Sequence, residues 1–466
     1  MRALDRTRKG LRTPQAGQLR TRLTTTLIAL AVVAGLGAAG LAVTRDQGRA
    51  VLAAGSNPVT PGSFTGYGFD QCLAPTQAKM DAWLEHSPFL SVGIYISGNS
   101  RACRSQPNLT PTWVSNQLRK GWKLLPITLG PQSPCVGRYP RYGASIDPTI
   151  STNPTNTWGA ARTQARAEAE RAVSVATSLG IVPGSTLFYD LEGWSDYTHA
   201  TCRESALAFL SAWTRKVRAL GYVSGVYSSA GSGMRILDQA RSQGRADVAL
   251  PDQIWLARYD KVANTSATQY LSDAGWQGQR IKQYMGGHDE TWGGVTINID
   301  RNYLHIGGGS RASRETHCGG VPVDFSRYPA LAPGVTRTEV RTLKCLLVEQ
   351  GITGVNVSSA YYGRGLAKGI NTWLLREGFQ STTSWRAGHW KGLLPRGGSG
   401  IQKFGSSGAP VWRLQRALVA RGYAVPLSGV LDATTVARVR DYQTARGLKA
   451  TGIVTPTVWS KLYRGL

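Results

Sequence analysis

Short apolar runs alternate with amphipathic stretches between residues 67 and 300, which predicts alternating strands and helices. Runs rich in β-branched and aromatic side chains and bounded by Gly, Pro or Asp indicate eight strands: residues 67–70, 91–96, 123–128, 186–190, 223–227, 253–257, 280–284 and 295–300. Apolar positions three or four residues apart indicate helices between the first six strands: residues 77–86, 111–120, 159–179, 204–220 and 233–243.

Eight strands with intervening helices match the size of a closed (β/α)8 barrel of the TIM type, an α/β fold. The alternative is an open, doubly wound sheet, which usually carries a glycine-rich phosphate-binding loop after its first strand. No such loop follows residues 67–70. We therefore predict a barrel at 66–308, preceded by a linker at 44–65 that is rich in Ala, Gly, Pro and Ser.

After residue 332 the pattern becomes purely helical, and it repeats. The segments "VRTLKCLLVEQG" (340–351) and "VWRLQRALVARG" (411–422) both show V-x-x-L-x-x-x-L followed by a glycine. A second pair, "INTWLLREGF" (370–379) and "VRDYQTARGL" (439–448), follows at nearly the same offset of about 70 residues. The repeat predicts two small all-α modules of three helices, at 332–396 and 404–466, joined by a Gly/Ser-rich linker.

The N-terminal region has the pattern of an export segment. Basic residues dominate as far as Arg22, and the stretch from Leu23 to Val43 contains no charged residue. An apolar stretch of this length also approaches the roughly 20 residues that cross a bilayer. Residues 1–43 are therefore either a cleaved signal peptide or a membrane anchor, with the basic end inside in the second case.

The formal net charge of +27 over 466 residues predicts attraction to polyanions. Zinc-finger spacing, a helix-turn-helix signature and aromatic–basic ribonucleoprotein motifs are all missing from the sequence, so nucleic acid is not the expected partner. Anionic cell-wall polymers or a membrane surface fit the charge equally well. The charge therefore favours a surface or wall location over a nucleic-acid function.

The six cysteines are consistent with export. They show no C-x-x-C pair and the histidines are scattered, so we expect no metal site and no cofactor. An even number of cysteines in an exported chain favours disulfides, and six cysteines allow 15 pairings. The residues concerned are Cys72, Cys103, Cys135, Cys202, Cys318 and Cys345.

Acidic residues stand at the ends of three predicted strands. Asp70 ends the first strand, the fourth ends in Asp190 and Glu192 ("FYDLE"), and Asp300 ends the eighth. The carboxyl ends of barrel strands surround one mouth, and residues i and i+2 of a strand face the same side. These acids should therefore converge, and paired carboxylates can cleave a glycosidic bond by protonating the leaving oxygen and stabilising charge.

Two simpler interpretations apply to the same acids. A single Asp after a strand often caps the next helix, as we expect for Asp260, and a carboxylate cluster can bind a hard cation. Aromatic residues near the predicted mouth are candidates for sugar stacking, although each could equally be a core residue. These candidates are Tyr95, Trp194, Tyr227, Tyr259, Tyr284 and Trp292.

Several separated motifs carry a resemblance to a known family. "GFDQCLAPTQAKMDAW" (68–83), "VGIYISG" (92–98) and "GWKLLPITLGPQ" (121–132) resemble the glycoside-hydrolase-like domain of exported actinobacterial proteins. The segment is more distantly similar to family 25 glycoside hydrolases, which are lysozyme-type muramidases. That resemblance implies that Glu192 is the general acid, while Asp70, Asp190 and Asp300 stabilise charge or position water.

The C-terminal repeats resemble peptidoglycan-binding modules of three helices. The second copy carries the resemblance in "LDATTVARVRDYQTARGLKATGIVTPTVWSKL", whereas the first is degenerate, with Gly363 where the second has Asp432.

These observations predict a secreted, wall-associated glycan hydrolase that acts on peptidoglycan, and a non-catalytic wall-binding protein is the alternative. We expect Cys72–Cys103 and Cys135–Cys202 to tie neighbouring barrel loops, and Cys318–Cys345 to tie the interdomain segment to the first helical module. The expected partner is peptidoglycan or another wall glycan, with membrane contact only through the N-terminal segment if that segment is an anchor.

Overall fold

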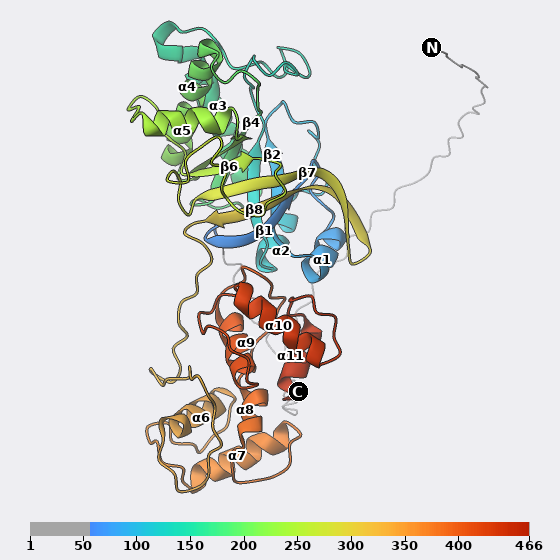
Figure 1. Cartoon of the computed structure of the whole chain (residues 1–466), viewed down its shortest axis with the longest axis vertical. Coiled ribbons are helices and arrows are strands. Elements are labelled where there is room, and N and C mark those ends of the chain that lie inside the picture. Colours follow the sequence, from blue (N-terminus) through green and yellow to red (C-terminus); the bar gives the residue numbers. More distant parts are fainter. Residues whose placement is uncertain (1–55, 466) are drawn as a thin grey trace, which may run out of the picture. The chain divides into compact units, whose positions relative to one another are not determined.

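The computed structural model describes residues 56–465 (Figure 1), and Gly55–Leu466 form one compact unit. The predicted signal peptide or anchor at 1–43, and the predicted linker as far as residue 55, lie outside the described residues. The rest of that linker contacts the barrel, since the Asn57 side chain donates to the Gly180 carbonyl (2.9 Å) and the first strand begins at Phe64. Among the described helices, none combines the length and apolar character needed to cross a membrane.

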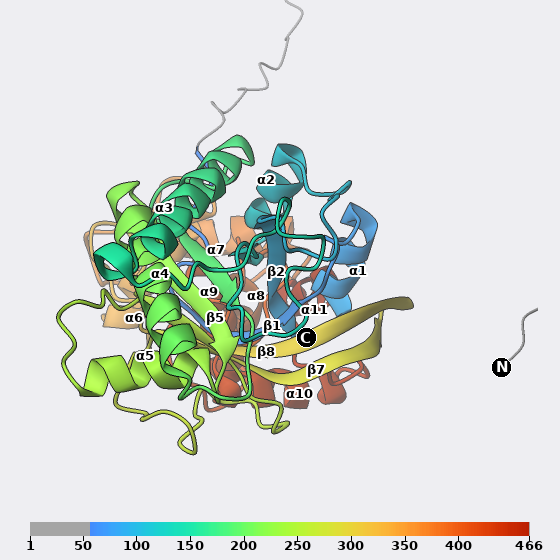
Figure 2. The same cartoon turned by 90° about the horizontal axis from the view of Figure 1, so that it is seen from above.

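Eight strands form a closed barrel in sequence order, as predicted. The strands are β1 (Phe64–Asp70), β2 (Phe89–Ser97), β3 (Lys123–Thr128), β4 (Thr186–Leu191), β5 (Val223–Ser229), β6 (Gln253–Ala257), β7 (Arg280–Trp292) and β8 (Val295–Ile306). One helix follows each of the first five strands: α1 (Gln77–His86), α2 (Pro111–Arg119), α3 (Thr155–Ser178), α4 (Ala200–Ala219) and α5 (Gly233–Ser242). These helices lie outside the strands (Figure 2), so the apolar strand faces are covered on both sides.

The last two strands depart from the regular β/α repeat. β8 runs antiparallel to both of its neighbours, β7 and β1. The cause is a tight turn at Gly293 and Gly294, whose φ angles of 59° and 76° suit a two-residue hairpin. Because such a turn reverses the chain at once, no crossover helix fits between β7 and β8, and the hairpin projects from the barrel (Figure 2).

The antiparallel β8 changes where its acid lies. The sequence predicted that Asp300 ends the eighth strand. This is wrong, because β8 continues to Ile306. Asp300 instead pairs directly with Asp70 in the β1–β8 register. The middle of β8 thus lies beside the carboxyl end of β1, which brings the two acids together although β8 runs in the opposite direction.

Six further helices form two modules after the barrel, each with its own apolar core. The first contains α6 (Thr338–Glu349), α7 (Arg364–Arg376) and α8 (Ala387–Leu393), packed around Trp373 and Trp390. The second contains α9 (Ala409–Val419), α10 (Ala433–Ala445) and α11 (Pro456–Tyr463), packed around Tyr442 and Trp459. The two modules therefore match the predicted repeat of three helices.

The repeat difference noticed in the sequence has a local structural effect. Asp432 precedes α10, and its carboxylate accepts the Thr435 backbone N–H (2.7 Å), which satisfies one free donor of the first turn. Gly363 takes the same position before α7 and has no side chain to do so.

The structure contains the three disulfides expected from the sequence: Cys72–Cys103, Cys135–Cys202 and Cys318–Cys345. The described residues include no free cysteine. The first bond joins the loops after β1 and β2, the second joins the β3–α3 loop to the first turn of α4, and the third joins the segment after β8 to α6.

Candidate active site

The four predicted acids gather at one end of the barrel. Asp70, Glu192 and Asp300 line a cavity of about 280 Å³, which we call the acid cavity. Asp190 lies beside this cavity and is 1% exposed. Its Oδ2 accepts a hydrogen bond from the Tyr95 hydroxyl (3.2 Å), and Tyr95 itself lines the cavity. Acids from β1, β4 and β8 therefore meet in one site, as the strand-end pattern predicted.

Asp70 is the most constrained of these acids. Its carboxylate accepts from the side-chain amides of Asn302 (2.6 Å) and Gln283 (3.0 Å). Burial raises the pKa of Asp70 well above its usual range, and the neighbouring Asp300 carboxylate raises it further. The pKa of Asp300 is raised as well, mainly by burial, although a hydrogen bond with Asp70 opposes this. The pair can therefore hold one proton between its two carboxyl groups.

Asp190 also favours its protonated form. Burial raises the pKa of Asp190 well above its usual range, and the charge on Glu192 adds to this, while the Tyr95 hydroxyl acts in the opposite direction. The Oδ1 atom of Asp190 is buried and has no hydrogen-bond partner among the described residues. A buried carboxylate oxygen without a partner is costly, which agrees with a neutral carboxyl group.

A buried glutamine fixes the chain between Asp190 and Glu192. The Gln132 side chain donates to the Asp190 carbonyl (2.7 Å) and accepts from the Glu192 backbone N–H (2.8 Å). This pair of bonds extends β4 with a side chain from the β3–α3 loop. It holds the Glu192 backbone at the cavity although the strand itself ends at Leu191.

Glu192 is more accessible than Asp190: the Glu192 side chain is 24% exposed, whereas Asp190 is buried. One of its oxygens lies 2.6 Å from the Arg138 guanidinium, which comes from the β3–α3 loop. The Arg138 side chain is itself 57% exposed, so the ion pair sits at the mouth of the site and is partly screened by water.

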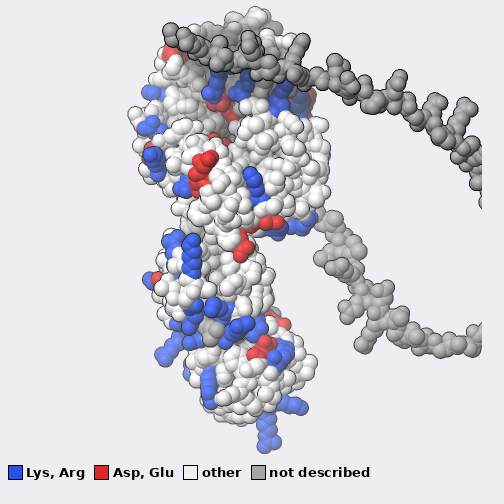
Figure 3. Space-filling model, turned by 90° about the vertical axis from the view of Figure 1, so that its right-hand side faces the viewer, with Lys and Arg blue, Asp and Glu red and all other residues white. Residues whose placement is uncertain are grey.

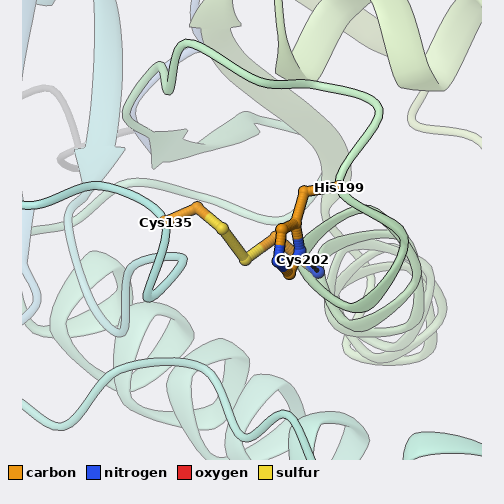
Figure 4. Close-up of side chains that lie close together, drawn as sticks. All are labelled: Cys135, His199 and Cys202. Atoms are coloured by element: carbon orange, nitrogen blue, oxygen red, sulfur yellow. Dashed lines mark hydrogen bonds between the residues drawn. A yellow bond between two sulfur atoms is a disulfide. The ribbon is translucent and has the colours of Figure 1, made fainter.

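The Cys135–Cys202 disulfide anchors the loop that carries Arg138. Cys202 lies in the first turn of α4, and His199 caps that helix beside the disulfide (Figure 4). Cys135, His199 and Cys202 lie close enough to hold a metal ion, but both sulfurs are in the disulfide and do not provide thiolate ligands. The cluster of Cys318, Cys345 and Glu349 is of the same kind.

The six predicted aromatic residues separate into two groups. Tyr95 lines the acid cavity, while Tyr227 and Tyr259 line an adjoining cavity of about 320 Å³ that Glu192 also lines. Both of these tyrosine hydroxyls donate to the side-chain oxygen (Oε1) of Gln283. Trp194 is buried in the barrel core, and Tyr284 and Trp292 line a different cavity that contains none of the four acids.

Two acids near the site, Asp260 and Glu290, are engaged elsewhere. Asp260 does not cap a helix: it accepts from the Val262 backbone N–H (3.0 Å) within a turn and pairs with Lys282 (2.9 Å). Glu290 on β7 pairs with Arg301 and with His288. None of these acids lines the acid cavity.

Sequence reasoning missed several residues of the site. Gln283 and Asn302 are polar residues inside buried strands, and their departure from the apolar pattern was a detectable signal. Arg138 and Arg141 lie in a long Pro/Gly/Ser loop whose path no periodicity reveals. Gln132 lies at the start of that loop and was equally hidden.

Comparisons with known proteins agree with the motifs. Residues 81–304 match the family model "Rv2525c-like, glycoside hydrolase-like domain", and residues 407–462 match a peptidoglycan binding domain model, PG_binding_1. The chain thus contains a glycoside hydrolase-like domain and a peptidoglycan-binding domain in these two segments. No curated protein matches the chain.

Solved structures similar to the chain share 11–17% sequence identity with it. An uncharacterized B. stearothermophilus protein is 17% identical, with TM-score 0.32 over 51% of this chain and 95% of that one. The Mycobacterium tuberculosis Tat-secreted protein Rv2525c, in complex with L-tartrate, is 13% identical, with TM-score 0.33 over 52% and 95%. A family 25 glycosyl hydrolase from Bacillus anthracis is 11% identical, with TM-score 0.30 over 52% and 89%.

Proposed function

We propose that this protein, which joins a glycoside hydrolase-like barrel to a peptidoglycan-binding domain, is an exported hydrolase that cleaves glycosidic bonds of peptidoglycan. The observation that carries the proposal is the convergence of Asp70, Glu192 and Asp300 on one cavity, with Asp190 directly beside them. Glycoside hydrolysis requires a carboxylic acid that protonates the leaving oxygen and a carboxylate that stabilises or attacks the sugar cation.

Glu192 is the proposed general acid. It lines both cavities and is accessible, so its carboxyl group can reach a glycosidic oxygen of a bound chain. The buried Asp190 accepts a hydrogen bond from Tyr95 and so fixes the position of this side chain, which lines the cavity. Asp70 and Asp300, whose pKa values are both raised, can hold one proton between them, and the remaining negative charge would stabilise the oxocarbenium-like transition state or position water.

The C-terminal domain would hold the barrel on its polymeric substrate. A tethered second binding site raises the local concentration of substrate around the barrel without any new contact in the active site. The basic surface acts in the same direction on an anionic wall. On the face in Figure 3, Lys and Arg side chains are spread more widely than Asp and Glu side chains.

One observation favours a second candidate, a wall-binding protein that does not cut the glycan. The carboxylate of Glu192 is ion-paired with Arg138 (2.6 Å), and a carboxylate in an ion pair has no proton to donate. Under this alternative the barrel would hold a glycan chain in the same cavity without cleaving it.

A release assay separates the two candidates. Purified peptidoglycan and other wall polysaccharides are incubated with wild type, Glu192→Gln and the control Glu170→Gln, which changes an exposed acid on α3. We expect soluble fragments from wild type and from the control, and a loss of at least about 100-fold in Glu192→Gln. If wild type binds the walls but releases no fragments from any of them, the hydrolase proposal is excluded and the wall-binding alternative is supported.

A further inference from the structure

Two arginines line the acid cavity together with its carboxylates. Arg101 from the β2–α2 loop and Arg141 from the β3–α3 loop both contribute to its wall. Among the described residues, neither guanidinium forms an ion pair with a carboxylate, whereas the neighbouring Arg138 is paired with Glu192. An arginine without an acidic partner in a concave site is available to an anionic ligand.

The Arg101 guanidinium is held in place by the backbone. Its Nε donates to the Gly98 carbonyl (2.8 Å) and its Nη1 to the Tyr95 carbonyl (3.1 Å), while its Nη2 has no acceptor among the described residues. Arg141 is fixed by aromatic and polar contacts: its Nη2 donates to the Tyr139 hydroxyl (3.1 Å), and its guanidinium lies 5.3 Å from the Tyr139 ring centre. Both groups are therefore positioned before any ligand binds.

The two loops that carry these arginines are joined to each other. The Tyr142 hydroxyl donates to the Arg101 carbonyl (3.0 Å), and the Asn99 side chain donates to the Ile146 carbonyl (2.9 Å). The buried Asp147 carboxylate accepts the backbone N–H of Arg141 (2.6 Å), which fixes the turn that presents this side chain. The disulfides Cys72–Cys103 and Cys135–Cys202 constrain the same loops covalently.

The acids of the site do not cancel the positive charge of this wall. Arg138 neutralises Glu192, and burial raises the pKa of both Asp70 and Asp190, so these two carboxyl groups carry less negative charge. The cavity thus holds two guanidinium groups without an ion-pair partner among the described residues, against the one negative charge left on the Asp70–Asp300 pair.

We propose that Arg101 and Arg141 form a subsite for the carboxylate of an acidic sugar adjacent to the bond that is cut. This inference rests on the proposed function and narrows its substrate. In peptidoglycan the muramyl sugar carries a lactyl carboxyl group, which is an uncharged amide while the stem peptide is attached and an anion once the peptide has been removed. The guanidinium pair therefore selects peptide-stripped glycan strands, and an amide-hydrolysing reaction must supply this substrate.

Binding measurements with matched glycans test the subsite. The full chain carries Glu192→Gln, which prevents turnover, and Arg138→Gln, which removes the arginine that the first change leaves unpaired. It is titrated with peptide-stripped strands, with stem-bearing strands, with stripped strands whose carboxyl groups are converted to methylamides, and with chitin oligosaccharides of equal length. We expect the stripped strands to bind at least about tenfold more tightly than either neutral glycan, as charge-assisted hydrogen bonds require. Any contribution of the C-terminal domain is common to all variants and cancels when they are compared.

Arginine substitutions assign the preference to the cavity. Arg101→Gln and Arg141→Gln should each remove most of the preference for peptide-stripped strands over neutral glycans. Arg104→Gln should leave this preference unchanged, because Arg104 stacks on Tyr142 outside the cavity. Arg141 makes few contacts through its side chain, so its variant is informative even if Arg101→Gln fails to fold. A preference that survives Arg141→Gln would overturn the subsite.

Two further outcomes would also overturn the proposal. One is equal binding of charged and neutral glycans. The other is equal binding of stripped and stem-bearing strands. That result would mean that the protein does not distinguish the free lactyl carboxylate from the carboxylates of the stem peptide. Failure of the hydrolase proposal is a separate result: wild type would release no fragments, while an arginine-dependent preference for the carboxylate persisted.

Discussion

The Arg138 guanidinium lies 2.6 Å from the carboxylate of Glu192, the proposed general acid. The two residues come from different loops, and the Cys135–Cys202 disulfide constrains the loop that carries Arg138. The ion pair uses the ionised carboxylate, so Glu192 must take up a proton from solvent, and lose this ion pair, before it can donate that proton to a substrate. Arg138 is therefore a control point for the proposed chemistry.

Arg138→Gln should increase glycan hydrolysis by roughly two- to tenfold, because an exposed ion pair contributes up to about 1 kcal/mol. Arg138→Lys keeps the charge and is the matched control, with activity near that of wild type. The measurement is the initial rate of release of reducing ends from peptidoglycan at neutral pH. A tenfold decrease in Arg138→Gln would instead mean that this guanidinium contacts the substrate.

Asp70→Asn should make the protein more stable at neutral pH while it removes hydrolysis. The pKa of Asp70 is raised in the folded state, so the folded chain retains a proton that the unfolded chain loses above about pH 4. The stability contributed by this proton is present below the unfolded pKa and is lost as the pH rises through the raised folded pKa. Asn cannot lose a proton and keeps an oxygen for Asn302 and Gln283.

Urea unfolding of both proteins at several pH values measures this effect. The stability advantage of Asp70→Asn should grow as the pH increases above 4 and exceed about 1.4 kcal/mol, the equivalent of a tenfold change in proton affinity. Asp289→Asn changes an exposed acid outside the cavity and serves as the control. A constant difference across this pH range would show that Asp70 titrates normally in the fold.

Removal of the Cys135–Cys202 disulfide should affect both stability and substrate binding. The bond spans 67 residues, and its loss as Cys135→Ala/Cys202→Ala should cost about 2–4 kcal/mol in the free energy of unfolding. The freed loop carries Arg138 and Arg141, so KM should rise. Cys318→Ala/Cys345→Ala removes a bond far from the cavity in the chain and should lower stability without changing KM. Equal KM values in the two variants would contradict the role given to the loop.

Lys403 provides a pH-dependent contact between the barrel and the second helical module. Its buried Nζ donates to the carbonyls of Leu84, Ser87 (2.8 Å) and Phe89 (3.2 Å), at the end of α1 and the start of β2. Burial lowers the pKa of Lys403 to about 7 from the ordinary 10.5. The unfolded chain thus binds more protons between these values, so this residue makes wild type more stable as the pH rises from about 7 to 10.5.

Lys403→Met should abolish that rise. The difference in unfolding free energy between wild type and Lys403→Met is measured at pH 6.5, 8 and 9.5, with Lys391→Met in the first module as the control. We expect wild type to gain a few kcal/mol relative to Lys403→Met over this range, since a tenfold change in proton affinity is worth about 1.4 kcal/mol. A pH-independent difference would show that Lys403 remains charged in its buried position.

Local sequence patterns predicted most of the elements correctly. The start of regular helix at residue 159 is an example: Asn156, Thr157 and Trp158 have positive φ angles, and the right-handed helix continues after them. The repeated modules were also predictable, because helical periodicity is a property of short segments. The even cysteine count indicated disulfides, and the first two pairs followed from the expected barrel, in which loops after neighbouring strands lie side by side. Strand ends that carry acids identified Asp70 and the Asp190–Glu192 pair in the same way.

The aromatic residues mark the limit of such reasoning. Tyr227 and Tyr284 both lie on barrel strands beside apolar neighbours, yet one lines a cavity next to Glu192 and the other lines a cavity without these acids. Inward and outward positions alternate along a strand, so an error of one residue in the register moves a side chain to the opposite face.

The sequence by itself determined the eight strands, the helices, the cysteines and the acids of this protein, because each depends on the spacing of neighbouring residues. Only the tertiary structure decided the antiparallel direction of β8, the pairing of Asp70 with Asp300, and the contacts of Arg138 and Arg101 with the site. The physical reason is that closure of the barrel places Asp70 beside Asp300, which lies 230 residues later in the chain. No local periodicity encodes such a contact. The loop arginines line the cavity because disulfides and hydrogen bonds between the two loops hold them there.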